Sequence, residues 1–260
     1  MKTFRFIGMA LFAVLMCVNL TSCSGGDDDP TEEQGKEEGG VISGKKLVKI
    51  VGTGYYEHES FTFDYDNERK LIKAIYTEGT NGNVDVVNYK FIWSDKVIKV
   101  DRNGAYECTY TFGNGMIQQE KGEDYNINFT YNKSNRIIKI EDENDIITTV
   151  WNEDKLMSIS EEDREHNFIY GGSCKKGYYP LFGELLGSPA GQMLFVAHPE
   201  IAGMKTTQLP STHTWTYDYG VYGSGSKIDH LNYEFDNDGY ISKINGEVNG
   251  EPYTYTITWE

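Results

Sequence analysis

The stretch Asn126–Ile140, which reads NINFTYNKSNRIIKI, contains the pattern that decides the fold. Ile127, Phe129 and Tyr131 alternate with polar residues, which is typical of a strand with one face in a core and the other in water. The polar residues 132–135 follow, and then a second apolar run begins. This stretch therefore predicts two antiparallel strands joined by a tight turn.

The same hairpin pattern recurs along the chain. From Trp93 onward, the aromatic residues that end an alternating run are separated by 19, 19, 20 and 19 residues. The pattern returns near Phe235 and ends at Trp259, and Leu47–Ile50 corresponds to the second half of a truncated first unit. Such repetition predicts an all-β fold, a long antiparallel meander of aromatic hairpin repeats that forms a curved sheet or a partly closed barrel. The ring side chains, Phe235 included, are expected to share one buried face. The residues that end the runs are Tyr65, Trp93, Phe112, Tyr131, Trp151 and Tyr170.

The repeat is interrupted at about residues 175–210. Tyr178–Leu186 and Gln192–Val196 have apolar residues at helix-like spacing, with Gly, Ser and Pro between them. We expect a short helical insert that packs over an end or the concave side of the sheet. A second interpretation makes this insert a lid or one wall of a binding cleft.

The N-terminal residues have the features of an export signal. Lys2 and Arg5 precede the apolar run Phe6–Val18 of 13 residues, which is shorter than the ~20 residues that span a bilayer. Leu20–Cys23 then resembles the lipoprotein box of bacteria. The resemblance implies that 1–22 is a signal peptide and that the Cys23 thiol carries a diacylglyceryl group. An ordinary secretory signal with an incidental cysteine is the alternative.

Residues 23–44 are expected to be a lipidated cysteine followed by a flexible tether. Positions 24–44 hold seven acidic residues and one basic residue, a composition that cannot bury apolar area. Ser24–Asp29 resembles the acidic signal that directs Bacteroidota lipoproteins to the outer face of the outer membrane, although a plain solvated spacer would have the same composition. We expect an outer-membrane lipoprotein, exposed at the cell surface, with residues 45–260 as a single β domain.

Charge excludes one class of partner. The chain has 24 basic and 40 acidic residues, a net charge of -16, so phosphate backbones would be repelled and no nucleic acid is expected. Without residues 1–22 the balance is 22 basic against 40 acidic residues, or -18. Two cysteines remain beside Cys23. Cys108 alternates with Tyr110, which favours a place in the core, while a disulfide with Cys174 is the alternative.

Two resemblances rest on these features. Tyr65–Leu71, Tyr131–Ile137 and Phe235–Ile241 resemble the Tyr-Asp-x-x-Gly-Arg-Leu units of bacterial YD-repeat proteins, but Gly and Arg rarely occur together here. The whole arrangement of lipobox, acidic tether, aromatic hairpins, helical insert, Leu209–Ser211 and the closing segment Tyr233–Tyr240 is similar to a family of Bacteroidota outer-membrane lipoproteins of unknown function. That resemblance implies a porin-like fold and a location, and it implies no reaction or ligand.

A membrane-spanning pore is not expected. The repeated strands are about five to eight residues long, whereas transmembrane strands need ~9–11. Lysines in the second strand of several units, such as Lys73, Lys99 and Lys139, would also be unfavourable against lipid.

No motif for catalysis or metal binding is present in the sequence. The five histidines are scattered, and there is no His-Glu-x-x-His, phosphate-binding loop or Gly-x-Ser-x-Gly elbow. Asp236–Gly239 is similar to the start of a calcium loop but lacks the distal Glu, so a hairpin turn is expected there. We therefore expect no catalytic residue, no metal site and no cofactor.

The residues that flank the insert are the candidate binding site. Tyr178 and Tyr179 precede the insert, and the segment after it contains Trp215, Tyr217, Asp218 and Tyr222. Aromatic faces stack on sugars, and Asp can fix hydroxyl groups. The plainer interpretation is that Trp215 and Tyr217 continue the core stripe.

Together these features favour a membrane-anchored, non-catalytic binding module that captures a glycan or a cell-surface protein. A carboxylate-based glycan hydrolase and an acyl-chain carrier are the alternatives.

Overall fold

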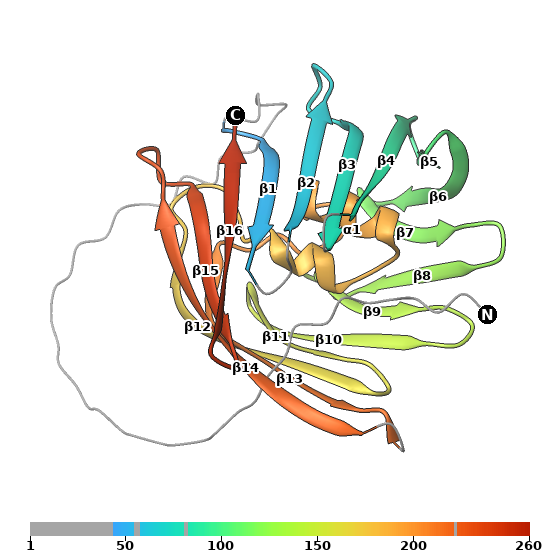
Figure 1. Ribbon diagram of the computed structural model, residues 1–260. Coiled ribbons are helices and arrows are strands. Elements are labelled where there is room, and N and C mark those ends of the chain that lie inside the picture. Colours follow the sequence, from blue (N-terminus) through green and yellow to red (C-terminus); the bar gives the residue numbers. More distant parts are fainter. Residues whose placement is uncertain (1–43, 55–57, 81–82, 221–222) are drawn as a thin grey trace, which may run out of the picture.

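The described residues form a closed β-barrel. The computed structural model describes residues 44–260 except 55–57, 81–82 and 221–222. In this part, sixteen strands pair antiparallel with their neighbours in sequence, and β1 (Leu47–Thr53) pairs with β16 (Glu251–Trp259) to complete the ring (Figure 1). The predicted all-β meander is confirmed. The truncated first unit is also explained, because its missing first half is the last strand of the chain.

Between these two, the strands run in chain order. They are β2 (His58–Tyr65), β3 (Leu71–Thr80), β4 (Asn83–Trp93), β5 (Val97–Arg102), β6 (Ala105–Gly113), β7 (Met116–Lys121), β8 (Asn126–Tyr131), β9 (Ile137–Glu141), β10 (Ile146–Asn152), β11 (Lys155–Ser160), β12 (Arg164–Ser173), β13 (Gln208–Asp218), β14 (Ser224–Phe235) and β15 (Ile241–Val248). Their lengths range from five residues in β9 to twelve in β14. The expectation of five to eight residues was therefore wrong for the longer strands, and strand length alone does not argue against a pore.

The turns behave as their sequences predict. In four of them the first residue caps the turn, because one Oδ1 atom accepts hydrogen bonds from two backbone amides; this holds for Asp66, Asn132, Asp142 and Asp236. Asp236 and Asp238 also form salt bridges with Lys45 at 3.0 and 2.7 Å. The segment that is similar to a calcium loop is thus a hairpin turn, as expected.

A recurrent hydrogen bond links neighbouring hairpins at the end of the barrel where Gly44 enters. Leu71 in β3 lies two residues before the first β3–β4 pair, Lys73 with Lys90. Its carbonyl has therefore passed the end of that ladder, and it accepts a hydrogen bond from Trp93 Nε1 at 2.6 Å. Six more carbonyls at the same place in other hairpins accept from Tyr or Trp at 2.6–2.7 Å. We call the seven donors the anchor residues: Tyr65, Trp93, Tyr131, Trp151, Tyr170, Tyr233 and Trp259.

A β-bulge accompanies each of these acceptor carbonyls. Tyr65 pairs with Leu71 while Asp64 pairs with Lys73, so Ile72 is the extra residue of a bulge. The β4–β5 hairpin shows no such shift, and the β5–β6 ladder extends to Val97 at the start of β5. Phe112, which cannot donate, occupies the anchor position facing that strand. The residue type at each anchor position thus matches the local strand pairing: a side chain that can donate a hydrogen bond is present where a carbonyl lacks a strand partner.

The helical insert occupies the barrel interior. The 3-10 helix η1 (Leu181–Leu185) and the helix α1 (Pro189–Ala197) lie inside the ring of strands (Figure 1). Ser188 caps α1 by accepting from Gly191 N, and Phe195 of α1 packs edge-on against Tyr110 and Phe129 of the wall. A ring of sixteen strands encloses more space than its own side chains can fill. The insert therefore fills the barrel interior and forms part of the core, in addition to covering the inner face of the sheet.

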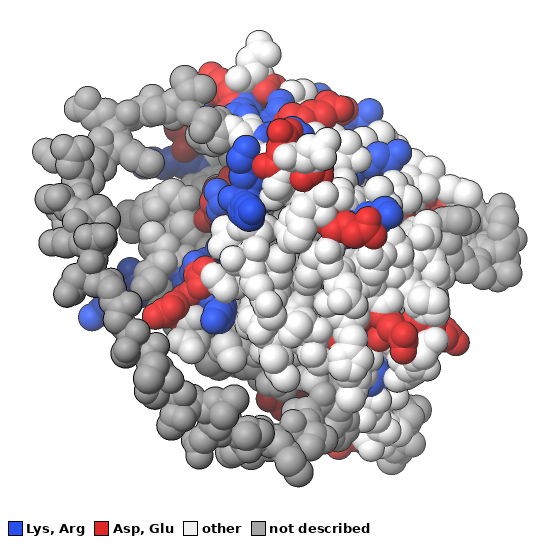
Figure 2. All heavy atoms as spheres, turned by 90° about the vertical axis from the view of Figure 1, so that its left-hand side faces the viewer, with Lys and Arg blue, Asp and Glu red and all other residues white. Residues whose placement is uncertain are grey.

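The side chains alternate between a mostly apolar interior and an outer wall that carries polar residues together with exposed aliphatic ones such as Val150. Along β16, Tyr253, Tyr255 and Ile257 are buried while Thr256 and Thr258 are exposed. Figure 2 shows one outer face, on which charged side chains of both signs gather along the upper edge and the wall below is mostly uncharged. Phe235 was expected on the buried face, but 46% of it is exposed, because Tyr233, two residues earlier, supplies the anchor in β14.

The remaining cysteines are both buried and unpaired in the described part of the chain, and Cys108 lies in the core. The structure thus agrees with the core position predicted for Cys108 and not with the disulfide alternative.

Removing one anchor hydroxyl should destabilise the barrel without opening a cavity. Tyr131→Phe keeps the ring but leaves the Ile117 carbonyl without its 2.6 Å donor, so we expect the free energy of unfolding to fall by about 1–2 kcal/mol. Urea unfolding followed by tryptophan fluorescence measures this. The matched control is Tyr219→Phe, whose hydroxyl makes no hydrogen bond in the described part of the chain and which should leave stability unchanged. Equal stability of the two variants would contradict the role of the anchors.

Candidate functional site

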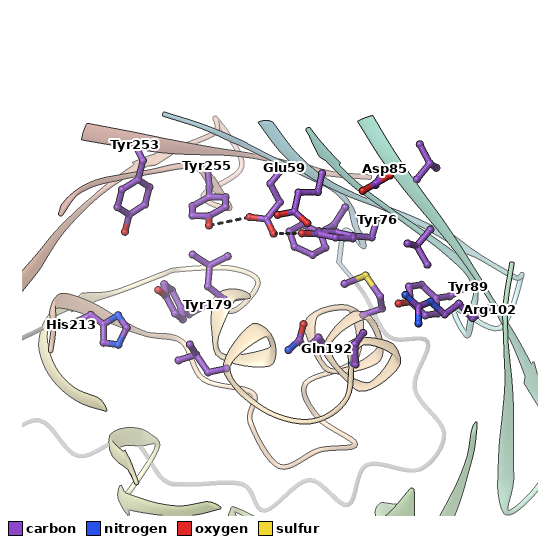
Figure 3. Close-up of a pocket in the computed structure, with 18 of the residues that line it drawn as sticks. Glu59, Tyr76, Asp85, Tyr89, Arg102, Tyr179, Gln192, His213, Tyr253 and Tyr255 are labelled. Carbon is purple, nitrogen blue, oxygen red and sulfur yellow. Dashed lines mark hydrogen bonds between the residues drawn. The ribbon is translucent and has the colours of Figure 1, made fainter. Parts of the chain in front are cut away.

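A cavity of about 550 Å³ lies between the insert and one side of the barrel wall. Its walls come from β2–β5, β12–β14 and β16 of the barrel on one side and from η1 and α1 on the other (Figure 3). It lies towards the end of the barrel at which β4 begins and β5 ends, opposite the end at Gly44. The cavity is therefore a candidate binding site enclosed by the fold itself.

Glu59 of β2 is the central polar group of this cavity. Figure 3 shows it between Tyr76 and Tyr255, whose hydroxyls donate to its two carboxylate oxygens at 3.1 and 3.4 Å. Glu59 is only 8% exposed. Burial raises its pKa to about 7, with a further rise from the charge of Glu78, although the hydrogen bonds from both tyrosines act in the opposite direction.

Three more carboxylates line the same cavity. Asp229 of β14 is 1% exposed and accepts a hydrogen bond from Tyr253, and burial raises its pKa to about 6. Glu78 of β3 and Asp85 of β4 lie near the mouth, on the two paired strands of one hairpin. Arg102 is the one lysine or arginine among the described lining residues. The cavity is therefore strongly acidic.

Two stacked histidines continue from the cavity into the wall. His213 lines the cavity, and its ring stacks on Phe168 at 4.6 Å and on His166 at 5.3 Å. The two imidazoles share a hydrogen bond of 3.1 Å between Nδ1 of His166 and Nε2 of His213. Burial lowers the pKa of His166 to about 4 and holds the pKa of His213 well below its usual value. Both are neutral at pH 7, so they add no positive charge to the cavity.

A second cavity, of about 390 Å³, opens at the other end of the barrel, where the chain enters at Gly44. Its lining includes the anchor rings Tyr65, Trp93 and Trp259. His198 fixes the insert here, since its Nε2 accepts from Leu71 N at 3.1 Å and its Nδ1 lies 2.8 Å from Glu200. Among the residues described, none lines both cavities, so the insert separates the two ends.

The structure does not bring the predicted binding residues together. Tyr178 lines the second cavity, where its hydroxyl donates to the Val196 carbonyl at 2.9 Å and its ring packs on Trp259. Tyr179 lines the acidic cavity and packs on Phe182. Although these two tyrosines are adjacent in sequence, they line opposite ends of the interior.

Three of the four residues predicted after the insert lie on β13, outside both cavities. Trp215 is buried and stacks on His166 at 5.7 Å, with Tyr217 packed beside it. The two rings are on the inward phase of β13 but form a small cluster of their own beside the main core. Asp218 is exposed and its Oδ1 accepts from Gly220 N, so it caps a turn. Tyr222 lies outside the described residues.

The acidic cavity was not predicted, although the positions of its acidic residues in the sequence indicate it. Glu59 stands on the inward phase of its strand, two residues before Phe61, and Asp229 stands two residues before Leu231. Glu78 and Asp85 are also on the inward phase of β3 and β4. Acidic residues on the inward phase of a strand predict polar groups inside the barrel; Glu120 of β7 is another and lies outside the cavity, whereas these four line it.

Two further properties of the described residues bear on function. No group of three or more His, Cys, Asp or Glu residues lies close enough to hold a metal ion in residues 44–260 outside the gaps. None of the helices seen in this part of the chain is long and apolar enough to cross a membrane.

Comparisons with known proteins identify the fold. No protein-family model and no curated protein sequence matches the chain. A porin-like protein from Bacteroides uniformis superposes with a TM-score of 0.64 at 15% identity, covering 82% of this chain and 98% of that one. A porin-like protein from Bacteroides vulgatus gives a TM-score of 0.56 at 12% identity, with coverage of 84% and 99%. These similarities confirm a porin-like barrel fold.

The raised pKa of Glu59 predicts a specific pH dependence of stability. Because its pKa rises from 4.5 to about 7 on folding, the folded protein binds the proton more tightly. Its contribution to stability is therefore present below pH 4.5 and is lost as the pH rises through 7. Glu59→Gln should remove this loss, on the order of 1–3 kcal/mol.

Thermal unfolding between pH 4.5 and 8 measures the effect. Since His166 and His213 contribute with the opposite sign below pH 6.5, the difference between the variant and the natural protein isolates Glu59. A difference that does not change with pH would show that Glu59 titrates normally.

Proposed function

We propose that this protein is a membrane-anchored, non-catalytic binding module that holds a short glycan in the acidic cavity. The observation that carries the proposal is the combination of aromatic walls and buried carboxylates in a preformed space inside the barrel. Its volume of about 550 Å³ lies within the range of roughly 300–1,000 Å³ that small-ligand sites occupy. Carboxylate oxygens accept hydrogen bonds from sugar hydroxyls, and rings such as Tyr179 and Tyr255 offer apolar surface to the C–H faces.

A glycan hydrolase is the second candidate, and one observation favours it. Two buried carboxyl groups of the same cavity, Glu59 and Asp229, have pKa values raised to about 7 and about 6. Glycosidases use a protonated carboxylic acid and an ionised carboxylate in the same site. An acyl-chain carrier is less suited to this cavity, because the buried carboxylates would be left facing hydrocarbon.

Binding is tested with a glycan array followed by calorimetry on the mature protein. If the cavity is the site, Asp229→Asn should weaken the binding of any glycan found by at least about tenfold, the cost of one charge-assisted hydrogen bond. Asp218→Asn is the matched control, because Asp218 is exposed outside both cavities, and it should leave affinity unchanged. Equal losses in the two variants would place the site elsewhere.

Product analysis separates the binding module from the hydrolase. The binding module should return every bound glycan intact after prolonged incubation at high protein concentration. Cleavage that is abolished by Glu59→Gln would establish the second candidate instead.

The proposed anchor is tested separately, at Cys23. The Cys23→Ala variant should lose the label when cells are grown with a radioactive fatty acid, and the protein should leave the membrane fraction. Retention of label and of membrane association in this variant would contradict lipidation at Cys23. Protease treatment of intact cells then tests surface exposure, since a surface lipoprotein is degraded while a periplasmic one is protected.

A further inference from the structure

The acidic cavity carries an unbalanced negative charge. Its lining holds four carboxyl groups against the one guanidinium of Arg102. Arg102 is itself shared, since its Nη1 lies 3.7 Å from Glu107, which is not part of the lining. Its positive charge therefore cannot neutralise the carboxyl groups, even though Glu59, whose pKa is about 7, is partly protonated at pH 7. The acidic groups are Glu59, Glu78, Asp85 and Asp229.

The innermost of these carboxylates has an unused acceptor. Asp229 Oδ2 accepts from the Tyr253 hydroxyl and the backbone amide of Glu247 also favours the charged carboxylate, whereas Asp229 Oδ1 is buried and makes no hydrogen bond of normal geometry in the described part of the chain. A buried acceptor without a partner costs free energy, about 1–3 kcal/mol or more for a charged group. A ligand that donates a hydrogen bond at this position would recover that cost.

The rings around these carboxylates also suit a cation. Seven aromatic side chains line the cavity, and ring faces attract positive charge through their quadrupole, most strongly where water is excluded. In Figure 3, Tyr76, Tyr253 and Tyr255 lie along the same wall as Glu59. Carboxylates that alternate with aromatic rings are the usual surroundings of a bound ammonium group. The seven rings belong to Phe61, Tyr76, Tyr89, Phe168, Tyr179, Tyr253 and Tyr255.

From this charge balance, the free acceptor and the rings, we infer that the natural ligand carries a protonated amine, and that the glycan is an amino sugar whose amine is not acetylated. The inference rests on the proposed function and names its ligand class. A neutral sugar would bring no charge to pair with the buried carboxylates, so their loss of hydration would remain uncompensated. A ligand with a carboxylate or phosphate would be repelled.

The test compares two ligands that differ in N-acetylation, which removes the positive charge and adds an acetyl group. Calorimetry with the mature protein at pH 7 and low salt measures binding of a β-1,4-linked glucosamine trisaccharide and of its fully N-acetylated counterpart. We expect the free amine to bind at least tenfold more tightly, and the difference to shrink as salt is added. Asp229→Asn should reduce the ratio of the two affinities towards one, whereas Asp218→Asn should leave the ratio unchanged.

Three other results of the binding experiment would each overturn the inference, the proposed function or both. Equal or tighter binding of the acetylated sugar overturns the inference and leaves the glycan-binding proposal standing. If neither sugar binds but a linear diamine does, and Asp229→Asn abolishes that binding, the preference for a cation stands and the glycan does not. If no sugar and no diamine binds, both the inference and the proposed function are overturned. Circular dichroism of Asp229→Asn verifies that any loss of binding is not a loss of folding.

Discussion

The barrel depends on one recurrent interaction, the hydrogen bond from an inward-facing Tyr or Trp to a backbone carbonyl that has passed the end of its ladder. At Leu71 the chain leaves the β3–β4 pairing, and Trp93 supplies the donor that the neighbouring strand no longer provides. One side chain thus satisfies a polar group and fills the interior with its ring. Where the ladder continues to the end of the hairpin, Phe112 is sufficient. The repeat of aromatic residues in the sequence reflects this recurrent hydrogen bond.

The hairpins could be predicted from the sequence because they are local. Alternation around Tyr131 and the turn residues after it fix strand, face and reversal within about 15 residues. Closure is not local, since it depends on Leu47 meeting Trp259 at the far end of the chain. Strand length was underestimated because β14 extends through Gly225 and Ser226, which carry no periodic signal.

The binding site was harder to predict, for a different reason. The cluster of aromatic residues after the insert predicted a binding site at Trp215 and Tyr217, but the rings of these residues pack against other rings. The informative residues were the carboxylates on inward positions, such as Glu59 and Asp229. These acidic residues interrupt the repeat of apolar residues on the inward face of the strands. In a barrel whose interior is mostly apolar, a buried acid costs stability, and four carboxyl groups gathered in one cavity indicate a function that the fold does not require.

Closure of the ring of strands around the insert is the central claim about this structure, and amide hydrogen exchange tests closure most directly. If β1 and β16 pair as described, the amides of their paired residues, such as Ile50 and Ile257, should be protected as strongly as those of Phe129 and Ile140 in β8 and β9. Exchange of the β1 and β16 amides at the rate of fraying strands, with the inner strands still protected, would show an open sheet and contradict the account.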